Sequence, residues 1–232
     1  NGKPKGRGFL AYPKNYNGGI QIAAGDIDGD GEDEIVVVPA HRYKPEVRVY
    51  SFSGVLKNKF FAYAPGARLG LSLALGDIDG DGRLDIITGV REGGSAHIRM
   101  FNRDGTPLNA GFFAAASTYR GGVNITAVDT DGDGRAEIIT VPLNAKESPT
   151  VHLFGADGVL RRTAPLVSEK NSQFAVAAGD IDRNGDLTII VARTGARPGF
   201  QRFNADLEPA DPIATNLSAK DFRGAPALVI AQ

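Results

Sequence analysis

The strongest constraint on the fold is a unit of about 51 residues that occurs four times along this chain of 232 residues. The loop sequence GDIDGDG occupies residues 25–31 and returns unchanged at 76–82. Variants of it follow as VDTDGDG at 128–134 and GDIDRNG at 179–185. A repeat at this spacing indicates an array in which each unit buries its apolar surface against its neighbours.

Apolar runs of strand length surround each loop. One run precedes the loop, as at residues 20–23, and a second follows it, as at 35–38. A third run alternates apolar and polar residues, as at 47–50, and a weaker fourth run closes the unit, as at 60–63. Short β-branched or aromatic runs bounded by Gly, Pro, Asn or Asp are typical of strands, and no segment has a helical apolar stripe of useful length.

These runs predict an all-β fold, a β-propeller of four-stranded antiparallel blades. The first two runs are apolar on both faces, so we expect both faces of those strands to be covered. The third run alternates, as a more peripheral strand would. A β-solenoid is the competing repeat fold, but its coils are usually shorter and its strands parallel.

The repeat also predicts how the blades divide a single propeller domain. Phe9 falls at the position of Phe60 and Phe112, and residues 227–230 match a first strand. Four complete repeats are therefore flanked by one strand at each end, which suits a piece of a longer propeller or, less simply, a four-bladed ring with two extra strands. The predicted division is a preceding blade's last strand at 1–16, blades at 17–69, 70–121, 122–172 and 173–224, and a next blade's first strand at 225–232.

The first three loops carry the pattern D-x-D-G-D-G-x-x-(D/E). Alternate positions of a tight loop turn toward one point, so the carboxylates at positions 1, 3, 5 and 9 converge, and position 7 can add its main-chain oxygen. Several hard oxygens in a flexible loop suit Ca²⁺, whereas Mg²⁺ prefers to keep more of its water. The predicted ligands are Asp26, Asp28, Asp30 and Glu34, then Asp77, Asp79, Asp81 and Asp85, then Asp129, Asp131, Asp133 and Glu137, with main-chain oxygens from Glu32, Arg83 and Arg135.

The fourth loop departs from this pattern. Arg183 replaces a glycine, Asn184 replaces an aspartate, and Thr188 replaces the closing carboxylate. Asp180 and Asp182 are the two charged ligands that remain, with Asn184 as a neutral third. We therefore expect three calcium sites and a weak or empty fourth.

An EF-hand and a metal-free turn are the two alternatives to this kind of calcium loop. An EF-hand has a similar opening but needs a bidentate Glu at position 12 and flanking helices. Position 12 here is Val37, Thr88, Thr140 or Val191, each inside a β-branched run, so the loops join two strands. In a set of Asp-Gly turns without metal, three clusters of four carboxylates would repel strongly.

The loops with their flanking strands resemble FG-GAP/VCBS-type repeats, similar to the calcium-binding blades of integrin α-subunit propellers. The resemblance covers nearly the whole chain. It implies a β-propeller with calcium in the hairpin between the first and second strands of a blade. It also implies a secreted or cell-surface protein used in adhesion, carbohydrate binding or protein contact. Fungal lectins and some polysaccharide lyases contain this repeat too, and six to eight blades are common in the family.

Several features bear on location. Calcium modules outside cells typically bind at ~10⁻⁴–10⁻³ M, and sites of that affinity stay empty in the cytosol. We therefore expect an extracellular or cell-surface protein, and the absence of Cys fits a bacterial one. The apolar runs are too short for a transmembrane helix, so no membrane insertion is expected, and the polar residues 1–5 do not resemble a signal peptide.

The charge distribution points to a class of partner. The net charge is −1, which provides no overall attraction to nucleic acid. The predicted metal ligands take 14 of the 27 acidic residues, so the remainder of the chain is basic, and its bases gather in the loops opposite the acidic hairpins. An anionic glycan or protein is the expected partner, with Arg42, Tyr43, Lys44 and Arg197 as candidate ligand-face residues. Ordinary solvated loops are the alternative.

The sequence contains no G-x-S-x-G, H-E-x-x-H or P-loop motif, and its three His occupy non-equivalent positions in the repeats. No catalytic residue is predicted. We expect a non-enzymatic, calcium-binding adhesion or ligand-binding module. Two alternatives stay open. One is a polysaccharide lyase that uses calcium and a residue of the basic rim, and the other is an architectural spacer in a surface fibre.

Overall fold

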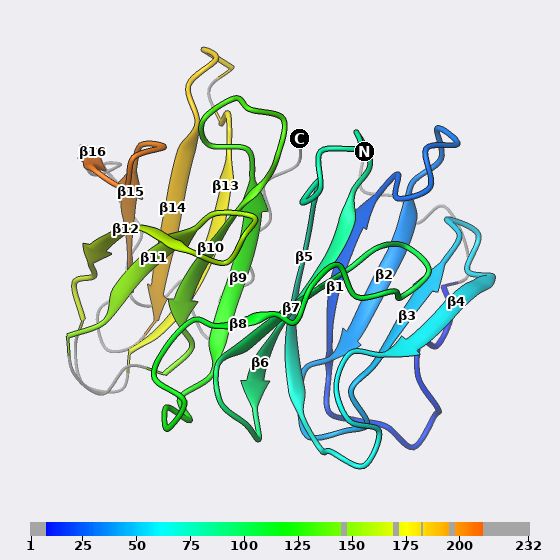
Figure 1. Cartoon of the computed structure of the whole chain (residues 1–232). Coiled ribbons are helices and arrows are strands. Elements are labelled where there is room, and N and C mark those ends of the chain that lie inside the picture. The colour runs from blue at the N-terminus through cyan, green and yellow to red at the C-terminus, as the bar shows by residue number, and fades with distance from the viewer. Residues whose placement is uncertain (1–7, 145–147, 169–171, 182, 195–197, 211–232) are drawn as a thin grey trace.

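The computed structural model describes residues 8–144, 148–168, 172–181, 183–194 and 198–210 (Figure 1). Every regular element in these ranges is a β-strand, and the strands form four antiparallel sheets of four. The predicted all-β fold of four-stranded blades is confirmed. No helix of the described part has the length and apolar character needed to span a membrane.

The strands follow one another in chain order within every sheet. The first sheet holds β1 (Ile20–Gly25), β2 (Glu34–Pro39), β3 (Glu46–Tyr50) and β4 (Leu56–Phe61). The second holds β5 (Gly70–Gly76), β6 (Asp85–Glu92), β7 (His97–Phe101) and β8 (Phe112–Phe113). The third holds β9 (Val123–Val128), β10 (Glu137–Pro142), β11 (Thr150–Phe154) and β12 (Leu160–Pro165). The fourth holds β13 (Gln173–Gly179), β14 (Thr188–Thr194), β15 (Gly199–Phe203) and β16 (Pro209–Ala210).

The sheets stand side by side in chain order, and their first strands contact one another, β1 with β5, β5 with β9, and β9 with β13 (Figure 1). Exposure grows outward across a blade. In the second sheet β5 and β6 are almost wholly buried, whereas most of β4 and β12 at the outer edge is exposed. This gradient explains why the inner runs are apolar on both faces and the third run alternates.

The core consists of apolar layers between neighbouring sheets. Ile87, Ile98, Ile125 and Ile138 belong to the layer between the second and third sheets, and similar layers fill the other two interfaces. Burying a side chain of this size stabilises the fold by roughly 1.5–3 kcal/mol. The stability of each blade therefore depends on its neighbours.

The strand β1 differs from the other first strands. Its Ile20 and Ile22 are 41% and 59% exposed, whereas Val123 and Ile125 at the same positions of β9 are buried. The reason is that β1 packs on β5 on one side only within the described residues. The expectation that both faces of every first strand are covered is therefore wrong for β1.

Equivalent isoleucines provide a matched test of this difference. Ile125→Val should lower the free energy of unfolding by about 1 kcal/mol, since it removes a buried methylene. Ile22→Val should change it by less than about 0.5 kcal/mol, since its side chain is exposed. Urea denaturation of the two variants measures both values. Equal losses would contradict this difference in packing.

The predicted strand at residues 1–16 is not formed by its described part, residues 8–16. A fourth strand needs the third strand of its own blade as a partner, and no strand of the described part pairs with residues 8–16. The segment nevertheless occupies the expected place. The ring of Phe9 lies 4.8 Å from that of Tyr50, as Phe60 lies 5.0 Å from Phe101. The predicted strand at 225–232 and the end of the fourth blade lie outside the described residues.

The same aromatic contact joins successive blades. A phenylalanine from one blade covers a glycine in the turn between the third and fourth strands of the next. The pairs are Phe9 with Gly54, Phe60 with Gly105 and Phe112 with Gly158, and a Cβ on each glycine would fall 2.5–2.7 Å from the ring. The interface between the third and fourth blades replaces both partners: Ala164 stands for the phenylalanine, and Leu207 (φ 59°) stands for the glycine. Both residues lie in one buried cluster, so the leucine fills the space that the ring occupies elsewhere.

Candidate metal centres

The leading aspartate of each acidic hairpin orders its loop. Asp26 accepts hydrogen bonds from the backbone amides of Gly29 (2.7 Å) and Gly31 (2.9 Å). Both glycines have positive φ, 77° and 87°, which turns their amides toward the carboxylate. The Gly31 amide lowers the pKa of Asp26, although burial works against it. Asp77 and Asp129 make the same pairs of contacts at 2.7–2.9 Å.

The closing carboxylate of each loop comes from the first residue of the second strand. Glu34, Asp85 and Glu137 are all buried. Asp85 accepts a hydrogen bond from the amide of Ile78 (2.9 Å), and Glu137 accepts one from that of Thr130 (2.8 Å). The sheet therefore holds this acid under the loop, and the hairpin brings the loop's own aspartates over it.

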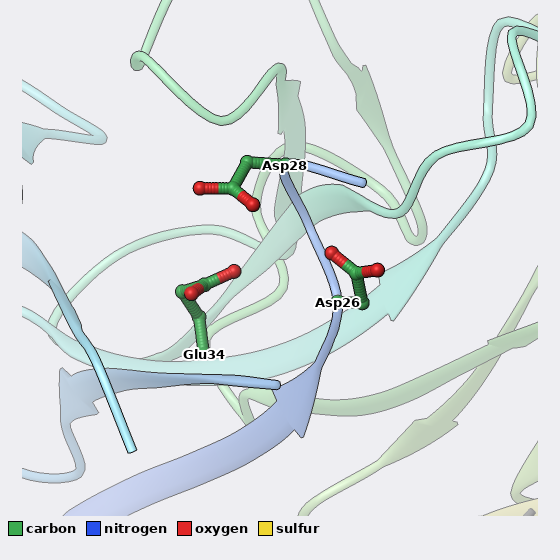
Figure 2. Close-up of side chains that lie close together, drawn as sticks. All are labelled: Asp26, Asp28 and Glu34. Atoms are coloured by element: carbon green, nitrogen blue, oxygen red, sulfur yellow. The ribbon is translucent and has the colours of Figure 1, made fainter. Parts of the chain in front are cut away.

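Each of the three hairpins gathers three carboxylates whose oxygens lie within 4.8 Å of one another. Figure 2 shows the first group, with the side chains of Asp26, Asp28 and Glu34 turned toward a common space. We call these groups the acidic triads. They consist of Asp26, Asp28 and Glu34; Asp77, Asp79 and Asp85; and Asp129, Asp131 and Glu137. Positions 1, 3 and 9 of the predicted ligand pattern thus come together.

Position 5 of the pattern lies outside the triads. One carboxylate oxygen of Asp30, Asp81 or Asp133 accepts the amide hydrogen of the residue two places on, at 2.8–2.9 Å. That residue is Glu32, Arg83 or Arg135. The part of these six residues in metal binding stays a prediction.

The donor sets fit a hard divalent cation. All nine triad ligands are carboxylates, and oxygen-only sets favour Ca²⁺ or Mg²⁺ over softer metals. Asp28 Oδ1 is buried and has no hydrogen-bond partner among the described residues. Burial raises the pKa of Asp85 to about 6, and the charges of Asp79, Asp81 and Asp77 contribute to the rise. A cation in the first triad would give Asp28 Oδ1 a partner, and a cation in the second would offset the repulsion between Asp85 and its neighbouring aspartates.

The first triad contains a cation from the protein itself, which was not predicted from the sequence. Lys57 of β4 places its Nζ 2.6 Å from Glu34 Oε1 and 3.1 Å from Asp28 Oδ2. Hydrogen bonds to these two carboxylates raise the pKa of Lys57. Among the described residues, no Lys or Arg lies at ion-pair distance from the other two triads. Comparing the repeats would not have revealed it, since the equivalent residues are Leu108 and Arg161, and Arg161 is also a cation but pairs with Asp157.

The fourth hairpin retains the loop shape without the closing acid. Asp180 accepts from the amides of Asn184 (3.2 Å) and Gly185 (3.0 Å). Arg183 adopts φ 58°, so it keeps the left-handed conformation that glycine has in the other loops. Thr188 supplies no carboxylate, and Asp182 lies outside the described residues. A weak site here stays a prediction.

Three of the candidate ligand-face residues, Arg42, Tyr43 and Lys44, lie in the connection β2–β3, at the opposite end of the strands from the triads. Arg42 and Tyr43 line a shallow pocket of about 390 Å³ together with Tyr16, His41 and Glu92. Arg42 Nε lies 3.3 Å from Glu92 Oε1, and His41 Nδ1 lies 3.1 Å from Glu92 Oε2, so Glu92 counters the local positive charge.

Tyr43 packs its ring 4.6 Å from that of Tyr16, so this face of its side chain is used in packing within the protein. Lys44 is exposed, and Arg197 lies outside the described residues. Ligand binding by these four residues stays a prediction.

Comparisons with known proteins agree with the repeat. The family model of the FG-GAP-like repeat matches three times, at residues 26–88, 77–140 and 129–191. Each match runs from one acidic hairpin to the second strand of the next blade. No curated protein matches the sequence.

Two solved structures match this chain. One is a protein of unknown function from Bacteroides caccae, with 12% identity and a TM-score of 0.47. The other is the exotype rhamnogalacturonan lyase YesX, with 15% identity and a TM-score of 0.44. Each alignment covers 78% of this chain, and the chain spans 57% and 41% of those two proteins. The three family matches together span residues 26–191, which is more than half of the sequence, and the chain belongs to the FG-GAP-like repeat family.

Proposed function

We propose that this protein is a calcium-stabilised β-propeller module that binds a protein or glycan ligand outside the cell or on its surface. The observation that carries the proposal is the recurrence of one acidic triad in the hairpin between the first and second strands of three successive blades. Ca²⁺ accepts many protein oxygens in flexible geometry, whereas Mg²⁺ keeps several waters. The expected affinity, ~10⁻⁴–10⁻³ M, is useful only where calcium is abundant.

Calcium would act on the blades as well as on single loops. Each triad joins the end of a first strand to the start of a second strand, so an ion there holds the hairpin closed. The hairpins also contact one another, since the Ala136 amide donates to the Asp77 carbonyl at 2.6 Å. Arg103 donates from the second blade to the Asp28 carbonyl of the first at 3.1 Å. Ordering one loop therefore supports the next blade.

We propose a binding role and not a catalytic one. The triads suit a structural ion, and the sequence predicts no pair of nucleophile and base. The opposite rim is formed by loops between the second and third strands and between blades, and loops of this kind commonly carry recognition. A polysaccharide lyase and an architectural spacer are the competing functions. Cleavage of an anionic polysaccharide by the purified protein would favour the first of them.

Equilibrium dialysis with radioactive calcium tests the metal sites. Protein stripped with EDTA should bind close to three ions per chain, one for each triad. Asp79→Asn and Asp131→Asn should each remove one ion. Asp104→Asn is the matched control, since this aspartate lies in the turn between a third and a fourth strand and caps the Thr106 amide. Absence of bound calcium at millimolar concentration would overturn the proposal.

The first site offers a separate test within the same dialysis. The Lys57 ammonium must leave the triad before calcium enters, so Lys57→Met should tighten the first site. The change is about tenfold if the ammonium occupies the triad roughly nine-tenths of the time. Lys59→Met on the same strand should leave the affinity unchanged, because Lys59 pairs with no carboxylate among the described residues.

A further inference from the structure

A pocket of about 950 Å³ lies between the second and third blades. The connections β8–β9 and β10–β11 border it, so it opens on the rim opposite the acidic triads. Its lining includes Ala114, Ala115, Tyr119, Thr140, Thr150 and His152. The repeat supplies an internal comparison at two places: the contact of residues 8–16 with the first blade, and the interface between the first and second blades.

A tyrosine fills the equivalent position at both of these places. Tyr63 donates its hydroxyl hydrogen to the carbonyl of His97 at 2.7 Å, with Thr88 O at 3.2 Å. Tyr12 contacts the carbonyls of Glu46 at 2.6 Å and Val37 at 3.3 Å. In each case the tyrosine follows the place of one blade's fourth strand and bonds to the second and third strands of the next blade.

The interface between the second and third blades has an alanine at this position, Ala115. Ala115 follows Ala114 as Tyr63 follows Ala62, and both alanine amides make the same backbone contact, Ala114 to Ala96 O and Ala62 to Pro45 O. The two acceptor carbonyls belong here to Thr140 and Thr150, since Thr140 pairs with His152 as Thr88 pairs with Arg99.

Nothing in the described part of the chain replaces the missing phenol. No described side chain donates a hydrogen bond to the Thr140 or Thr150 carbonyl. Tyr119 is the equivalent of Tyr16 instead. Its hydroxyl lies 3.1 Å from Asn144 O and 3.3 Å from Gly122 O, so it forms a wall of the pocket and leaves the position of Tyr63 open.

We propose that this pocket binds the side chain of a tyrosine from a partner polypeptide. The carbonyl oxygens of Thr140 and Thr150 are hydrogen-bond acceptors, so they suit a ligand with a neutral hydroxyl donor. The apolar walls formed by Ala114, Ala115 and the Tyr119 ring suit an aromatic ring. Both observed occupants of the equivalent position are tyrosine side chains of a polypeptide, and this favours a polypeptide over a sugar. The inference gives a location to the ligand-binding part of the proposed function and rests on it.

The pocket is poorly suited to the anionic partner expected from the basic rim. Backbone carbonyls repel an anion, and the nearest guanidinium is already engaged. Arg120 Nη1 donates to Ser117 O at 2.6 Å and to Tyr119 O at 3.0 Å. His152 is held by Thr150 Oγ1 at 2.6 Å and Ala114 O at 3.2 Å, and burial lowers its pKa, so its ring stays neutral near pH 7.

The test measures the binding of p-cresol, an analogue of the tyrosine side chain. Binding is followed by the changes of amide chemical shifts in NMR spectra of the whole protein. Shifts of Ala115 and Thr150 should saturate at millimolar p-cresol. Toluene lacks the hydroxyl and should bind about tenfold more weakly, the loss expected for one hydrogen bond or two. N-acetyltyrosinamide should reproduce the p-cresol shifts. Ala115→Tyr should abolish them, because the new ring occupies the pocket.

A second variant keeps the test informative if Ala115→Tyr alters the fold. Tyr63→Ala opens an equivalent pocket between the first and second blades and should add a second p-cresol site. Equal binding of p-cresol by the wild type and a folded Ala115→Tyr variant would overturn the proposal. So would binding of methyl glycosides without p-cresol, which would indicate a glycan site. Three bound calcium ions without p-cresol binding would refute the pocket alone, and p-cresol binding without calcium would refute the metal sites alone.

Discussion

Transfer from about 5 mM calcium to EDTA should lower the free energy of unfolding by about 3–7 kcal/mol. A site with a dissociation constant of ~10⁻⁴–10⁻³ M contributes about 1–2.3 kcal/mol at that concentration, because the ion binds the folded hairpin and not the unfolded chain. The three triads sum to this total when the blades unfold together. Guanidinium denaturation in the two conditions measures the difference.

The control for this effect is magnesium at the same concentration. Mg²⁺ has the same charge but demands near-octahedral geometry and gives up its water reluctantly, so it should restore only a small part of the stability. Asp79→Asn should reduce the calcium effect by the share of the second site, about 1–2.3 kcal/mol, since that triad loses a carboxylate. An unfolding midpoint that does not move between calcium and EDTA would refute a structural role for the triads.

Substitutions of Leu207 and Ala164, which meet between the third and fourth blades, should show strong energetic coupling. Leu207→Gly should cost about 2–4 kcal/mol, because it empties a buried site, even though it removes about 1 kcal/mol of strain at φ 59°. Ala164→Phe alone should cost about 1–3 kcal/mol, since the ring would meet the leucine in a packed cluster. The double variant recreates the Phe60–Gly105 contact and should recover most of both losses.

A double-mutant cycle by urea denaturation measures this coupling. Leu10→Gly serves as the control for removal of a leucine from a loop, since its side chain is 70% exposed. It should cost no more than about 1 kcal/mol, which is the backbone entropy of the new glycine. Strictly additive losses for Leu207→Gly and Ala164→Phe would show that the two side chains do not share one space.

Most of the fold could be predicted because the information is local and repeated four times. Strand propensity, alternation and turn residues each act over a few positions, and the repeat averages out accidental matches. The triads were predictable for the same reason, since positions 1, 3 and 9 of a hairpin are close in space whenever the loop forms. Position 5 does not join the triads, and Asp30, Asp81 and Asp133 each accept a hydrogen bond from the amide two residues on.

Features that join different blades could not be predicted in this way. The phenylalanine–glycine contact is visible in the sequence only after the neighbouring turn is known, and the missing strand at residues 8–16 depends on a partner strand. The pocket at Ala115 depends on the removal of one ring from a contact between two blades. Such relations follow from packing across an interface, and no local pattern encodes them.

The amino-acid sequence by itself determined the blade, the hairpin and the acidic side chains within it, because each is set by residues within one repeat. Only the tertiary structure decided that Lys57 sits among the acids of the first hairpin, that Ile22 is exposed where Ile125 is buried, and that Ala115 leaves a pocket. These outcomes depend on which surfaces meet across space, and burial and electrostatic contacts act through space irrespective of separation along the chain.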